Sequence, residues 1–367
     1  MRVNSESRPG KPNLGAHRVG RHGGDHAPRA PVTGALLALA ELDAAHTIQL
    51  VGRAGVVTEQ LETLLGGEHA RLRALRARLE LIDAPDVIDM ADRPSVALRG
   101  KVQSSMVVGL RLQADGRSDA FVSAGNTGAQ MAASKELLSL HPGLRRPAIC
   151  TVFPTARQPV VVIDSGANVD CSAVELAQFA RLGSVYAEDI LGRERPCVGL
   201  LSVGEEPEKG SRVVKEAHQL LRCAGLHFQG NVEGRDVVAG ASDRGPIDVV
   251  VCDGFVGNVL LKFYEAVPAL MTELMLRQGF DRDALRAAFA PLDYAERGGA
   301  PLLGVRGVSI ISHGKSGERA IKNAIKVALR AIETDLSAHI GRRLAESDGG
   351  ESRSTADSVG AKRTGTS

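Results

Sequence analysis

Three polar turns in the sequence have the composition of an anion-binding site. The first is Ala124-Gly125-Asn126-Thr127-Gly128, which follows the apolar run Ala120 to Ser123 and precedes a helical pattern. Ser165 to Asp170 and Asp253 to Asn258 also follow apolar runs. Where a helix begins at such a turn, its first N–H groups lack partners within the helix and can bind an anion. An ordinary capped turn is the alternative for any one of them.

The recurrence of this pattern carries more weight than any single turn. In an open α/β sheet, ligands bind beyond the carboxyl ends of the strands. Three such turns at strand ends therefore predict one shared polar crevice.

Lys209 is a further candidate, because it precedes the helix that begins at Arg212, in a turn with three glutamates. A lysine at a helix N-terminus could hold an anion or polarise a carbonyl. A surface salt bridge with a neighbouring glutamate is the alternative. A second basic stretch, Arg93 to Leu112, could supply cations from Arg99 and Lys101, or could be a solvated helix face.

These turns are expected to connect strands and helices that alternate along the chain. Strands are expected at 48–51, 79–82, 120–123, 149–153, 160–164, 198–203, 247–252 and 308–312, with another around Phe228. Helices are expected after 28, at 56–65, within 93–112, after 128, at 174–191, from 212, over 259–276 and after 317. Apolar strands that alternate with helices are typical of an α/β protein with a parallel sheet. A proline-bearing turn favours a hairpin between 149–153 and 160–164.

Composition excludes several classes of protein. The chain has 367 residues and a formal net charge of only +2, so no global field favours nucleic acid. It has no tryptophan and three tyrosines, too few for base-stacking platforms. Its five scattered cysteines form no CxxC pair, which predicts a reducing cytoplasm and neither a zinc site nor a disulfide framework. We expect no signal peptide, and no apolar run reaches the ~18 residues of a membrane span.

The long helix predicted from Val259 to Leu276 is apolar but interrupted by Lys262, Glu265 and Pro268. Its far end is the most apolar part, with Leu270, Met271, Leu274, Met275 and Leu276. Burial in the core is the default interpretation. A dimer face and a membrane-surface patch are the alternatives.

The two ends of the chain are polar, which predicts disorder over 1–16 and over 343–367. A single domain is expected to span 17–342. Its first strand, at 17–22, is atypical, because His17-Arg18-Val19-Gly20-Arg21-His22 is too polar for a central parallel strand.

Nine short stretches occur in the order and spacing of one protein family. They are Gly23–Pro28, Ser104–Gly109, Ser123–Ala129, Gly166–Asp170, Gly183–Ala187, Asn231–Asp236, Cys252–Val259, Gly298–Gly304 and His313–Gly314. On these stretches the chain closely resembles the bacterial phosphate acyltransferases of phospholipid synthesis. The resemblance covers nearly everything from Gly23 to about Ile340.

The resemblance implies transfer of a long-chain acyl group from acyl-acyl carrier protein to inorganic phosphate, giving acyl phosphate for phospholipid synthesis. It implies a three-layer αβα fold, Rossmann-like with a mostly parallel sheet, as in the isocitrate dehydrogenase and phosphotransacetylase group. It also implies a homodimer that uses no cofactor and no metal ion. Such a protein is expected in the cytoplasm, peripherally attached to the inner face of the cell membrane, in contact with the membrane glycerol-3-phosphate acyltransferase.

The reaction that the resemblance implies requires a phosphate site, because phosphate must be held and partly desolvated to attack a thioester. The polar turns are therefore candidates for phosphate binding. The candidates are Gly125, Asn126, Thr127, Gly128, Asn168, Asp253, Gly254 and Asn258. Lys209 matches the family's glutamate-rich, lysine-glycine turn and becomes the first catalytic candidate. His313 is the second, as a phosphate ligand or proton carrier, with a structural turn histidine as the alternative. Lys315 departs from the family's usual His-Gly-Ser-Ser.

The start of the chain also departs from the family, whose first strand runs into Asp-Ala-Met-Gly-Gly-Asp. Here Gly20-Arg21-His22 stands in place of Asp-Ala-Met. His17 to His22 can be encoded so that the same bases, read one position later, spell Ile-Ala-Leu-Asp-Ala-Met. We therefore predict that one base was lost near Gly23, in the gene or in its sequencing. Residues up to His22 would then be out of frame and disordered, leaving a gap in the sheet where the first strand belongs.

Two other functions remain open. The first is a weakly active or non-catalytic family member that acts as a membrane-surface scaffold, which the departure from the family at the first strand would explain. A nicotinamide-dependent dehydrogenase on a related fold is disfavoured, because the chain has no G-x-G-x-x-G fingerprint.

Overall fold

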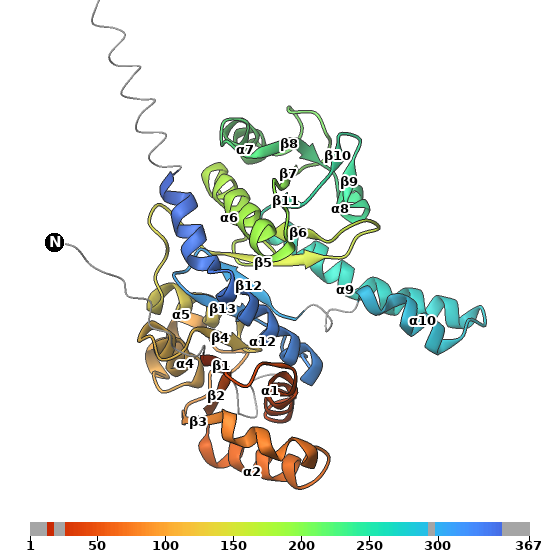
Figure 1. The fold of residues 1–367 in the computed structure, drawn as a ribbon. Helices are drawn as coiled ribbons and strands as arrows, with labels where there is room; N and C mark the ends of the chain where they lie inside the picture. Colours follow the sequence, from red (N-terminus) through yellow and green to blue (C-terminus); the bar gives the residue numbers. More distant parts are fainter. Residues whose placement is uncertain (1–12, 18–25, 293–297, 347–367) are drawn as a thin grey trace, which may run out of the picture.

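The computed structural model describes residues 13–17, 26–292 and 298–346, in which eleven strands form one sheet (Figure 1). The strands are β1 (Asn13–His17), β2 (Thr47–Gly52), β3 (Leu79–Asp83), β4 (Ala120–Ser123), β5 (Ala148–Phe153), β6 (Val160–Ile163), β7 (Cys197–Leu201), β8 (His227–Val232), β11 (Val249–Val251), β12 (Ala300–Leu303) and β13 (Val308–Ile311). Their order is β3-β2-β1-β4-β13-β12-β5-β6-β11-β7-β8. A separate two-stranded sheet pairs β9 (Ala241–Ser242) with β10 (Gly245–Pro246).

Helices cover both faces of the sheet, which confirms the three-layer αβα fold. They are α1 (Arg29–Glu41), α2 (Ala54–Gly66), α3 (Pro94–Gly100), α4 (Ser105–Ala114), α5 (Thr127–Leu137), α6 (Ala173–Leu191), α7 (Arg212–Arg222), α8 (Gly234–Ala239), α9 (Gly254–Arg277), α10 (Arg282–Phe289) and α12 (Glu318–Glu333). Short 3₁₀ helices span Ala70–Arg78 and Ala290–Leu292, and residues 336–346 are helical. The alternation of side chains along β4 shows the layers. Ala120 and Val122 pack with α1 and α12, whereas Phe121 packs with α4 and α5.

Polar side chains begin many of these helices, as the turn composition predicts. Each of these residues accepts a backbone N–H from the first helical turn: Ser104 (α4), Asn126 (α5), Ser172 (α6), Ser211 (α7), Asp253 (α9) and Asp281 (α10). Such caps satisfy one of the N–H groups that a helix start leaves unpaired. They fix where α5 and α9 start, and so where the candidate turns lie.

The sheet changes direction near its middle. β12 is antiparallel to both of its neighbours, β13 and β5, and β5 is antiparallel to β6, as the predicted hairpin requires. The remaining described neighbours in the sheet are parallel. β4 and β13 therefore run opposite to β6, β11 and β7.

The expected gap in the sheet is not present. Asn13–His17 forms β1, which pairs in parallel with β2 on one side and β4 on the other. The predictions of a disordered segment as far as residue 16 and of an empty central position are therefore wrong for residues 13–16. β1 obtains its ladder hydrogen bonds from main-chain pairing with β2 and β4. Residues 1–12 and 18–25 lie outside the described residues.

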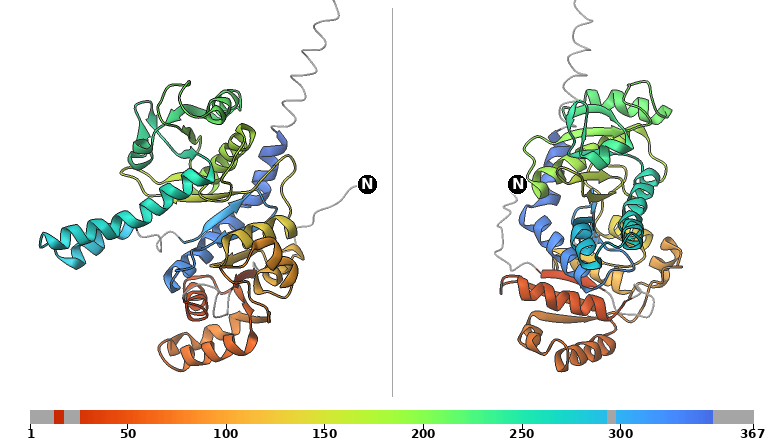
Figure 2. Two further views of the ribbon diagram at one scale, coloured as in Figure 1. Left: turned by 180° about the vertical axis from the view of Figure 1, so that it is seen from behind. Right: turned by 90° about the vertical axis from the view of Figure 1, so that its right-hand side faces the viewer.

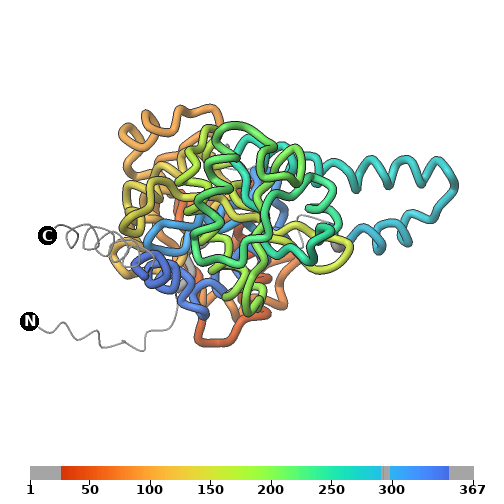
Figure 3. The backbone as a smooth tube through the Cα atoms, turned by 90° about the horizontal axis from the view of Figure 1, so that it is seen from above, coloured from red at the N-terminus to blue at the C-terminus, as the bar shows by residue number. Residues whose placement is uncertain are grey.

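The far end of α9 is not core, so the default interpretation of this stretch is wrong. α9 and α10 pack together and extend away from the sheet (Figures 2 and 3). Gly254 and Gly257 are the buried residues of α9, and Leu285 is that of α10. Large apolar side chains are left exposed on this pair of helices: Phe255, Val259, Phe263, Leu270, Met271, Leu274 and Phe280.

At the C-terminus, residues 343–346 continue the helix that begins at 336, so the predicted disorder does not start at 343. The helix remains ordered because Leu344 packs against the main hydrophobic cluster. The rest of the predicted disordered tail, 347–367, lies outside the described residues.

Candidate functional site

The side chain of Asn126 holds the turn after β4 in place. Its Oδ1 accepts the N–H of Ala129 at 3.0 Å and caps α5. Its Nδ2 donates to the backbone carbonyls of Asp89, Met90 and Asp92 at 3.2, 3.1 and 3.1 Å. Because the amide is committed to these contacts, we assign Asn126 a positioning role rather than a direct contact with phosphate.

The first turn of α5 directs backbone donors toward the carboxyl ends of β4 and β13. With the Ala129 N–H bound by Asn126, the N–H groups of Thr127 and Gly128 are those that a helix start leaves without an intrahelical acceptor. The positive end of the helix dipole favours an anion at the same place. Gly128 is needed for space, since a Cβ there would lie 3.0 Å from Cγ of Pro94.

Two buried hydroxyls lie just after β13, beside this turn. Ser312 and Ser316 are 2 % and 7 % exposed, and neither Oγ has a partner among the described residues. The Ser312 N–H donates to the carbonyl of Ser123 at 2.7 Å, which joins the ends of β13 and β4. A buried hydroxyl without a partner costs about 1–3 kcal/mol, and a bound ligand that accepts from it offsets that cost.

His313 lies between these serines in the chain and is half-buried. Its Nδ1 accepts the N–H of Lys315 at 3.1 Å, so the proton of the neutral ring is on Nε2. The neutral imidazole can therefore donate a hydrogen bond from Nε2. The structure thus gathers five sequence candidates at this edge: Gly125, Asn126, Thr127, Gly128 and His313.

Lys101, a possible cation for an anionic ligand, is already paired with the neighbouring loop. Its Nζ lies 2.5 Å from Oδ2 of Asp92 and 3.4 Å from Oδ2 of Asp89. The hydrogen bond to Lys101 lowers the pKa of Asp92, and the hydrogen bond to Asp92 raises the pKa of Lys101. The loop therefore neutralises this lysine.

The turn after β6 is built around the carboxylate of Asp164, which is 0 % exposed. Its Oδ1 accepts the N–H groups of Ile149, Gly166 and Ala167 at 3.1, 3.1 and 2.9 Å. Its Oδ2 accepts the backbone N–H and the Nδ2 of Asn168 at 2.6 and 2.8 Å. Burial raises the pKa of this carboxyl, while the hydrogen bonds oppose the rise. Sequence reasoning missed this residue, although an acidic residue at the end of a valine-rich strand is a visible signal.

Asn168 and Asp253 tie this turn to the start of α9. The Nδ2 of Asn168 also donates to the carbonyl of Pro147 at 2.8 Å, and the Asn168 carbonyl accepts the N–H of Gly254 at 2.7 Å. Asp253 Oδ1 accepts the N–H of Val256 at 2.9 Å. The donors here are committed and two carboxylates are present, so this turn suits phosphate less well than the turn after β4.

The two groups of candidates lie at opposite ends of the strands, because β4 and β13 run opposite to β6 and β11. The turns 165–170 and 253–258 do meet. A Cβ on Gly166 would lie 3.5 Å from Oδ1 of Asn258, which is exposed. The turn 124–128 meets the segment that follows β13 instead. The prediction of one crevice at the strand ends is therefore wrong.

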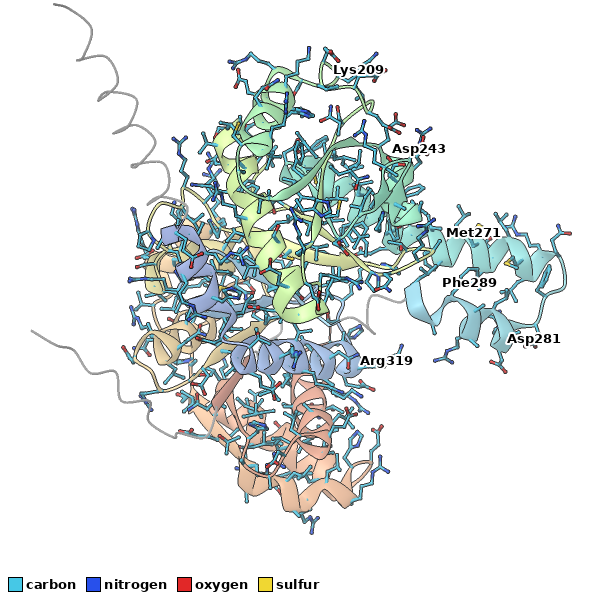
Figure 4. All side chains as sticks on the ribbon, turned by 45° about the horizontal axis from the view of Figure 1, so that its top comes forward. Lys209, Asp243, Met271, Asp281, Phe289 and Arg319 are labelled. Carbon is cyan, nitrogen blue, oxygen red and sulfur yellow. The ribbon has the colours of Figure 1, made fainter. Side chains whose placement is uncertain are left out.

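Lys209 is not brought together with His313. It follows β7, whose carboxyl end lies at the edge opposite that of β13. It is exposed and makes no ion pair with any of the described residues. Figure 4 shows Lys209 at one end of the molecule, distant from Arg319 in the first turn of α12.

The cysteines are poor candidates for nucleophilic catalysis. Burial raises the pKa of Cys171 to about 12 and of Cys197 to about 11, and it raises the pKa of Cys150 and Cys252 as well. A thiol with a raised pKa is a weak nucleophile at neutral pH. Cys223 is exposed. Within residues 13–17, 26–292 and 298–346, no group of three or more His, Cys, Asp or Glu side chains could hold a metal ion.

Comparisons with known proteins agree with this architecture. A family model described as "Fatty acid synthesis protein" matches residues 19–339, starting beyond β1. The phosphate acyltransferase of Heliobacterium modesticaldum is 46% identical over 329 residues, covering 87% of this chain and 94% of the relative. The phosphate acyltransferase of Salinibacter ruber is 45% identical over 329 residues, covering 86% of this chain and 94% of the relative.

Two phosphotransacetylases are among the solved structures that this chain resembles. The EutD phosphotransacetylase from Staphylococcus aureus has a TM-score of 0.58 at 15% identity, covering 88% of this chain and 95% of that one. A phosphotransacetylase from Streptococcus pyogenes has a TM-score of 0.57 at 18% identity, covering 88% and 94%. At these identities the likeness concerns the fold, which matches the group expected from the sequence.

Proposed function

The chain belongs to the phosphate acyltransferase family and is an acyltransferase, and we propose that it transfers a long-chain acyl group from acyl carrier protein to inorganic phosphate. The product, an acyl phosphate, would serve phospholipid synthesis. The family supports acyl transfer to phosphate. The carrier protein and the place in phospholipid synthesis are our proposal.

One observation supports placing phosphate at the ends of β4 and β13. The strand end that leads into α5 is joined to Ser312 by the hydrogen bond from its N–H to the Ser123 carbonyl, and the buried hydroxyls of Ser312 and Ser316 have no partner among the described residues. Phosphate oxygens accept hydrogen bonds, and a helix N-terminus favours their charge. The N–H groups of Thr127 and Gly128 would provide the backbone donors, with Gly125 and Asn126 holding the turn in shape.

In the proposed reaction, a phosphate oxygen attacks the thioester carbonyl carbon, the C–S bond breaks and the thiolate of the carrier protein leaves. Donors fixed before the reaction stabilise the oxyanion that forms on the carbonyl oxygen. The attacking hydrogenphosphate gives up its proton, which passes to the departing thiolate so that the thiol leaves neutral, and the Nε2–H of His313 can donate a hydrogen bond to the phosphate or to the oxyanion. The products are acyl phosphate and free carrier protein, and these steps use no metal ion or cofactor.

The second turn has a different role in this proposal. Asn168, Asp253 and Gly254 fix the base of α9 through their hydrogen bonds, and Asn258 lies exposed on its first turns. They would position α9 next to the substrate rather than bind phosphate. Lys209 is assigned no step.

We also propose that the protein attaches to the cytoplasmic face of a membrane through the exposed apolar residues of α9. Among the described residues, no helix is both long enough and apolar enough to cross a bilayer. Attachment there would allow contact with a membrane glycerol-3-phosphate acyltransferase that accepts acyl phosphate. We further propose that the protein is a homodimer.

The proposed function is tested with purified protein and palmitoyl-acyl carrier protein. Release of free carrier protein should require phosphate and should not change when NAD or a divalent metal is added. The double variant Ser312→Ala/Ser316→Ala should raise the KM for phosphate by about tenfold or more, because two donors are lost.

Ser202→Ala is the matched control. Its Oγ also has no partner among the described residues, but it follows β7 at the opposite edge of the sheet. The control should keep the wild-type KM for phosphate. Release without phosphate would contradict the function, and an unchanged KM in the double variant would contradict the placement of phosphate.

A further inference from the structure

α9 and α10 border a groove where this pair of helices meets the rest of the molecule. α9 runs outward from the sheet, the chain turns at Gly279, whose φ is +84°, and α10 returns along α9. The short helix Ala290–Leu292 follows α10. Phe289, the last residue of α10, and Arg319, in the first turn of α12, line the inner end of the groove (Figure 4).

The groove is large enough for a long hydrocarbon chain. Its volume is about 760 Å³, within the range of roughly 300–1,000 Å³ that is usual for ligand pockets. It follows α9 from Glu265 to Leu276, which corresponds to about 17 Å along the helix axis. The apolar residues of its lining are Pro268, Ala269, Leu276, Phe289, Ala290 and Leu292.

The acidic residues that line the groove are already paired with basic neighbours. Oε2 of Glu265 lies 2.7 Å from Nζ of Lys262, and Glu273 pairs with Arg277. Each pair joins successive turns of α9, where side chains three or four residues apart meet. Neither carboxylate therefore leaves an unbalanced negative charge in the groove.

The basic residues of the lining leave a positive excess. Arg282 and Arg286 are one helical turn apart on α10, and neither makes an ion pair with any described residue. Arg319 adds a further positive charge to the lining. A guanidinium group offers paired N–H donors that match the oxygens of a phosphate. The groove thus combines an apolar floor with groups that suit an anionic head group.

The inner end of the groove lies close to the proposed phosphate site. Arg319 follows Ser316 by three residues, a span of at most about 11 Å. Leu292 lines both the groove and a small adjoining cavity that also includes Gly299. A Cβ on Gly299 would lie 2.9 Å from Oγ of Ser312. An acyl phosphate formed at these serines would therefore leave its site beside the groove.

We propose that this groove binds a single-chain anionic amphiphile, the acyl phosphate that the reaction forms. The proposal rests on the function proposed above and gives its product a binding site on the exposed apolar helices. The hydrocarbon chain lies along the apolar residues of α9 and against Phe289, and Arg282 and Arg286 bind the phosphate group. A chain held in this way keeps its apolar surface out of water until it reaches a bilayer.

The first test measures binding without turnover, with a reporter in the groove. Because the chain has no tryptophan, Phe289→Trp introduces a single fluorescent indole among the lining residues. Without phosphate and carrier protein, dodecyl phosphate, a stable single-chain phosphate ester kept below micelle formation, should shift the emission to shorter wavelength. Calorimetry with the unsubstituted chain should give the same affinity. Val238→Trp, at an exposed position on α8, is the matched reporter and should not respond.

Two results of this test would overturn the proposal. One is the absence of binding by both fluorescence and calorimetry. The other is an equal response from the two reporters, which would show that the amphiphile coats the protein without using the groove.

The second test separates the head group from the chain. Arg282→Gln/Arg286→Gln should weaken binding of dodecyl phosphate by about tenfold or more, because two charge-assisted contacts are lost, and should leave binding of neutral dodecyl maltoside unchanged. Ala269→Phe, which fills the floor at an exposed position, should weaken binding of both. Arg71→Gln/Arg222→Gln removes the same charge at exposed positions elsewhere and should bind as wild type does. Wild-type affinity in the groove variants, or an equal loss in the control, overturns the proposal.

Vesicle binding distinguishes the product from a lipid of the bilayer. Leu270 and Leu274 lie on the exposed face of α9 and outside the groove lining, so Leu270→Glu/Leu274→Glu should bind dodecyl phosphate as wild type does. If Arg282→Gln/Arg286→Gln abolished vesicle binding and left the affinity for dodecyl phosphate unchanged, the arginines would bind bilayer head groups and the proposal would be wrong. Amphiphile binding without phosphate-dependent transfer would refute the proposed reaction but keep this site. Transfer without amphiphile binding would refute the site alone.

Discussion

The groups that the proposed reaction needs lie at the carboxyl ends of β4 and β13. Backbone donors of Thr127 and Gly128 and the hydroxyls of Ser312 and Ser316 lie there together. The Lys315 N–H fixes the ring of His313 through Nδ1, so that Nε2 carries the N–H that can donate a hydrogen bond. Loss of this ring should therefore affect turnover more than folding.

His313→Ala should lower kcat for phosphate-dependent release of carrier protein by about a hundredfold or more, the usual contribution of a fixed hydrogen-bond donor to charge that develops in the transition state. Lys209→Ala should leave kcat within about threefold, because an exposed side chain at the opposite edge touches no reacting atom. Both variants should melt near wild type. If the two effects came out in the reverse order, Lys209 would return to the catalytic site and His313 would be a structural turn residue.

Asp164→Asn should destabilise the protein by about 1–3 kcal/mol in urea unfolding, because the new Nδ2 would face donors of Asn168 instead of accepting them. Asp170→Asn is the control in the same turn, at an exposed position, and should unfold like wild type. Equal stability of Asp164→Asn and wild type would mean that the carboxylate does not organise this turn.

The effect of Asp164→Asn should also depend on pH. Burial raises the folded-state pKa of Asp164 above 3.8, so the folded state binds this proton more tightly than the unfolded chain. Its contribution to stability is therefore fully present below 3.8 and is lost as the pH rises through the raised pKa. The destabilisation should be larger at about pH 4 than at about pH 7. The opposite trend would contradict a raised pKa.

The sequence identifies the polar turns, but it does not reveal what their side chains bind. The amide of Asn126 reaches carbonyls 34 to 37 residues away, and that of Asn168 reaches a carbonyl 21 residues away. Such partners come from the packing of separate elements, so turn composition alone made both amides look available to a ligand. Ser312 and Ser316 were overlooked for the same reason, since only the fold shows that their hydroxyls are buried without partners.

At the scale of elements, α9 and α10 form the most unusual feature, an apolar pair of helices with little burial. Leu270 and Leu274 are 56% and 46% exposed, one helical turn apart on the same face. An exposed apolar face of this kind inserts readily into the headgroup region of a bilayer. It is separate from the core, so charges placed on it should not unfold the protein.

Leu270→Glu/Leu274→Glu should abolish binding to vesicles that contain anionic lipid, without lowering the melting temperature, as measured by vesicle sedimentation. Val238→Glu, an exposed apolar position on α8, is the matched control and should bind vesicles as wild type does. Vesicle binding that survives the double substitution would assign this face to another partner, such as a second subunit.

β1 offers a direct test of the frame hypothesis, because Gly15 pairs with Gln49 of β2 and with Phe121 of β4. Gly15→Pro should cost about 2 kcal/mol or more, since proline removes a ladder hydrogen bond in a central strand. A second chain carries Leu-Asp-Ala-Met at 19–22 and apolar residues at 17 and 18. In that chain Gly15→Pro should be nearly neutral, because the restored segment would supply the strand. If proline destabilised both chains equally, residues 13–17 would be the true first strand.

Long elements with clear periodicity were predicted well, as α6 and α12 show. β12 was missed because it has four residues and contains Pro301, and a short run with proline does not resemble a strand. The burial of α9 was misjudged for another reason. An apolar helix has the same pattern whether it faces a core, a second subunit or a membrane.

At the scale of the whole molecule, strand direction decides where the candidate residues lie. β12 is antiparallel to both β13 and β5, so β13 and β5 run in the same direction, and the β5–β6 hairpin then reverses β6 relative to β4. The proline-bearing turn predicted this hairpin. The pairing of β12 with β13 and β5 depends on contacts across the chain, which no local pattern in this sequence reveals.

The central claim is that a phosphate oxygen attacks the acyl carbon. The most direct measurement incubates the protein with palmitoyl-acyl carrier protein and phosphate labelled with heavy oxygen, and analyses the products by mass spectrometry. The account predicts palmitoyl phosphate that keeps every labelled oxygen of its phosphate, including the one that bridges to the acyl carbon. Unlabelled palmitate released at the same rate with and without phosphate would show that water is the nucleophile and would contradict the account.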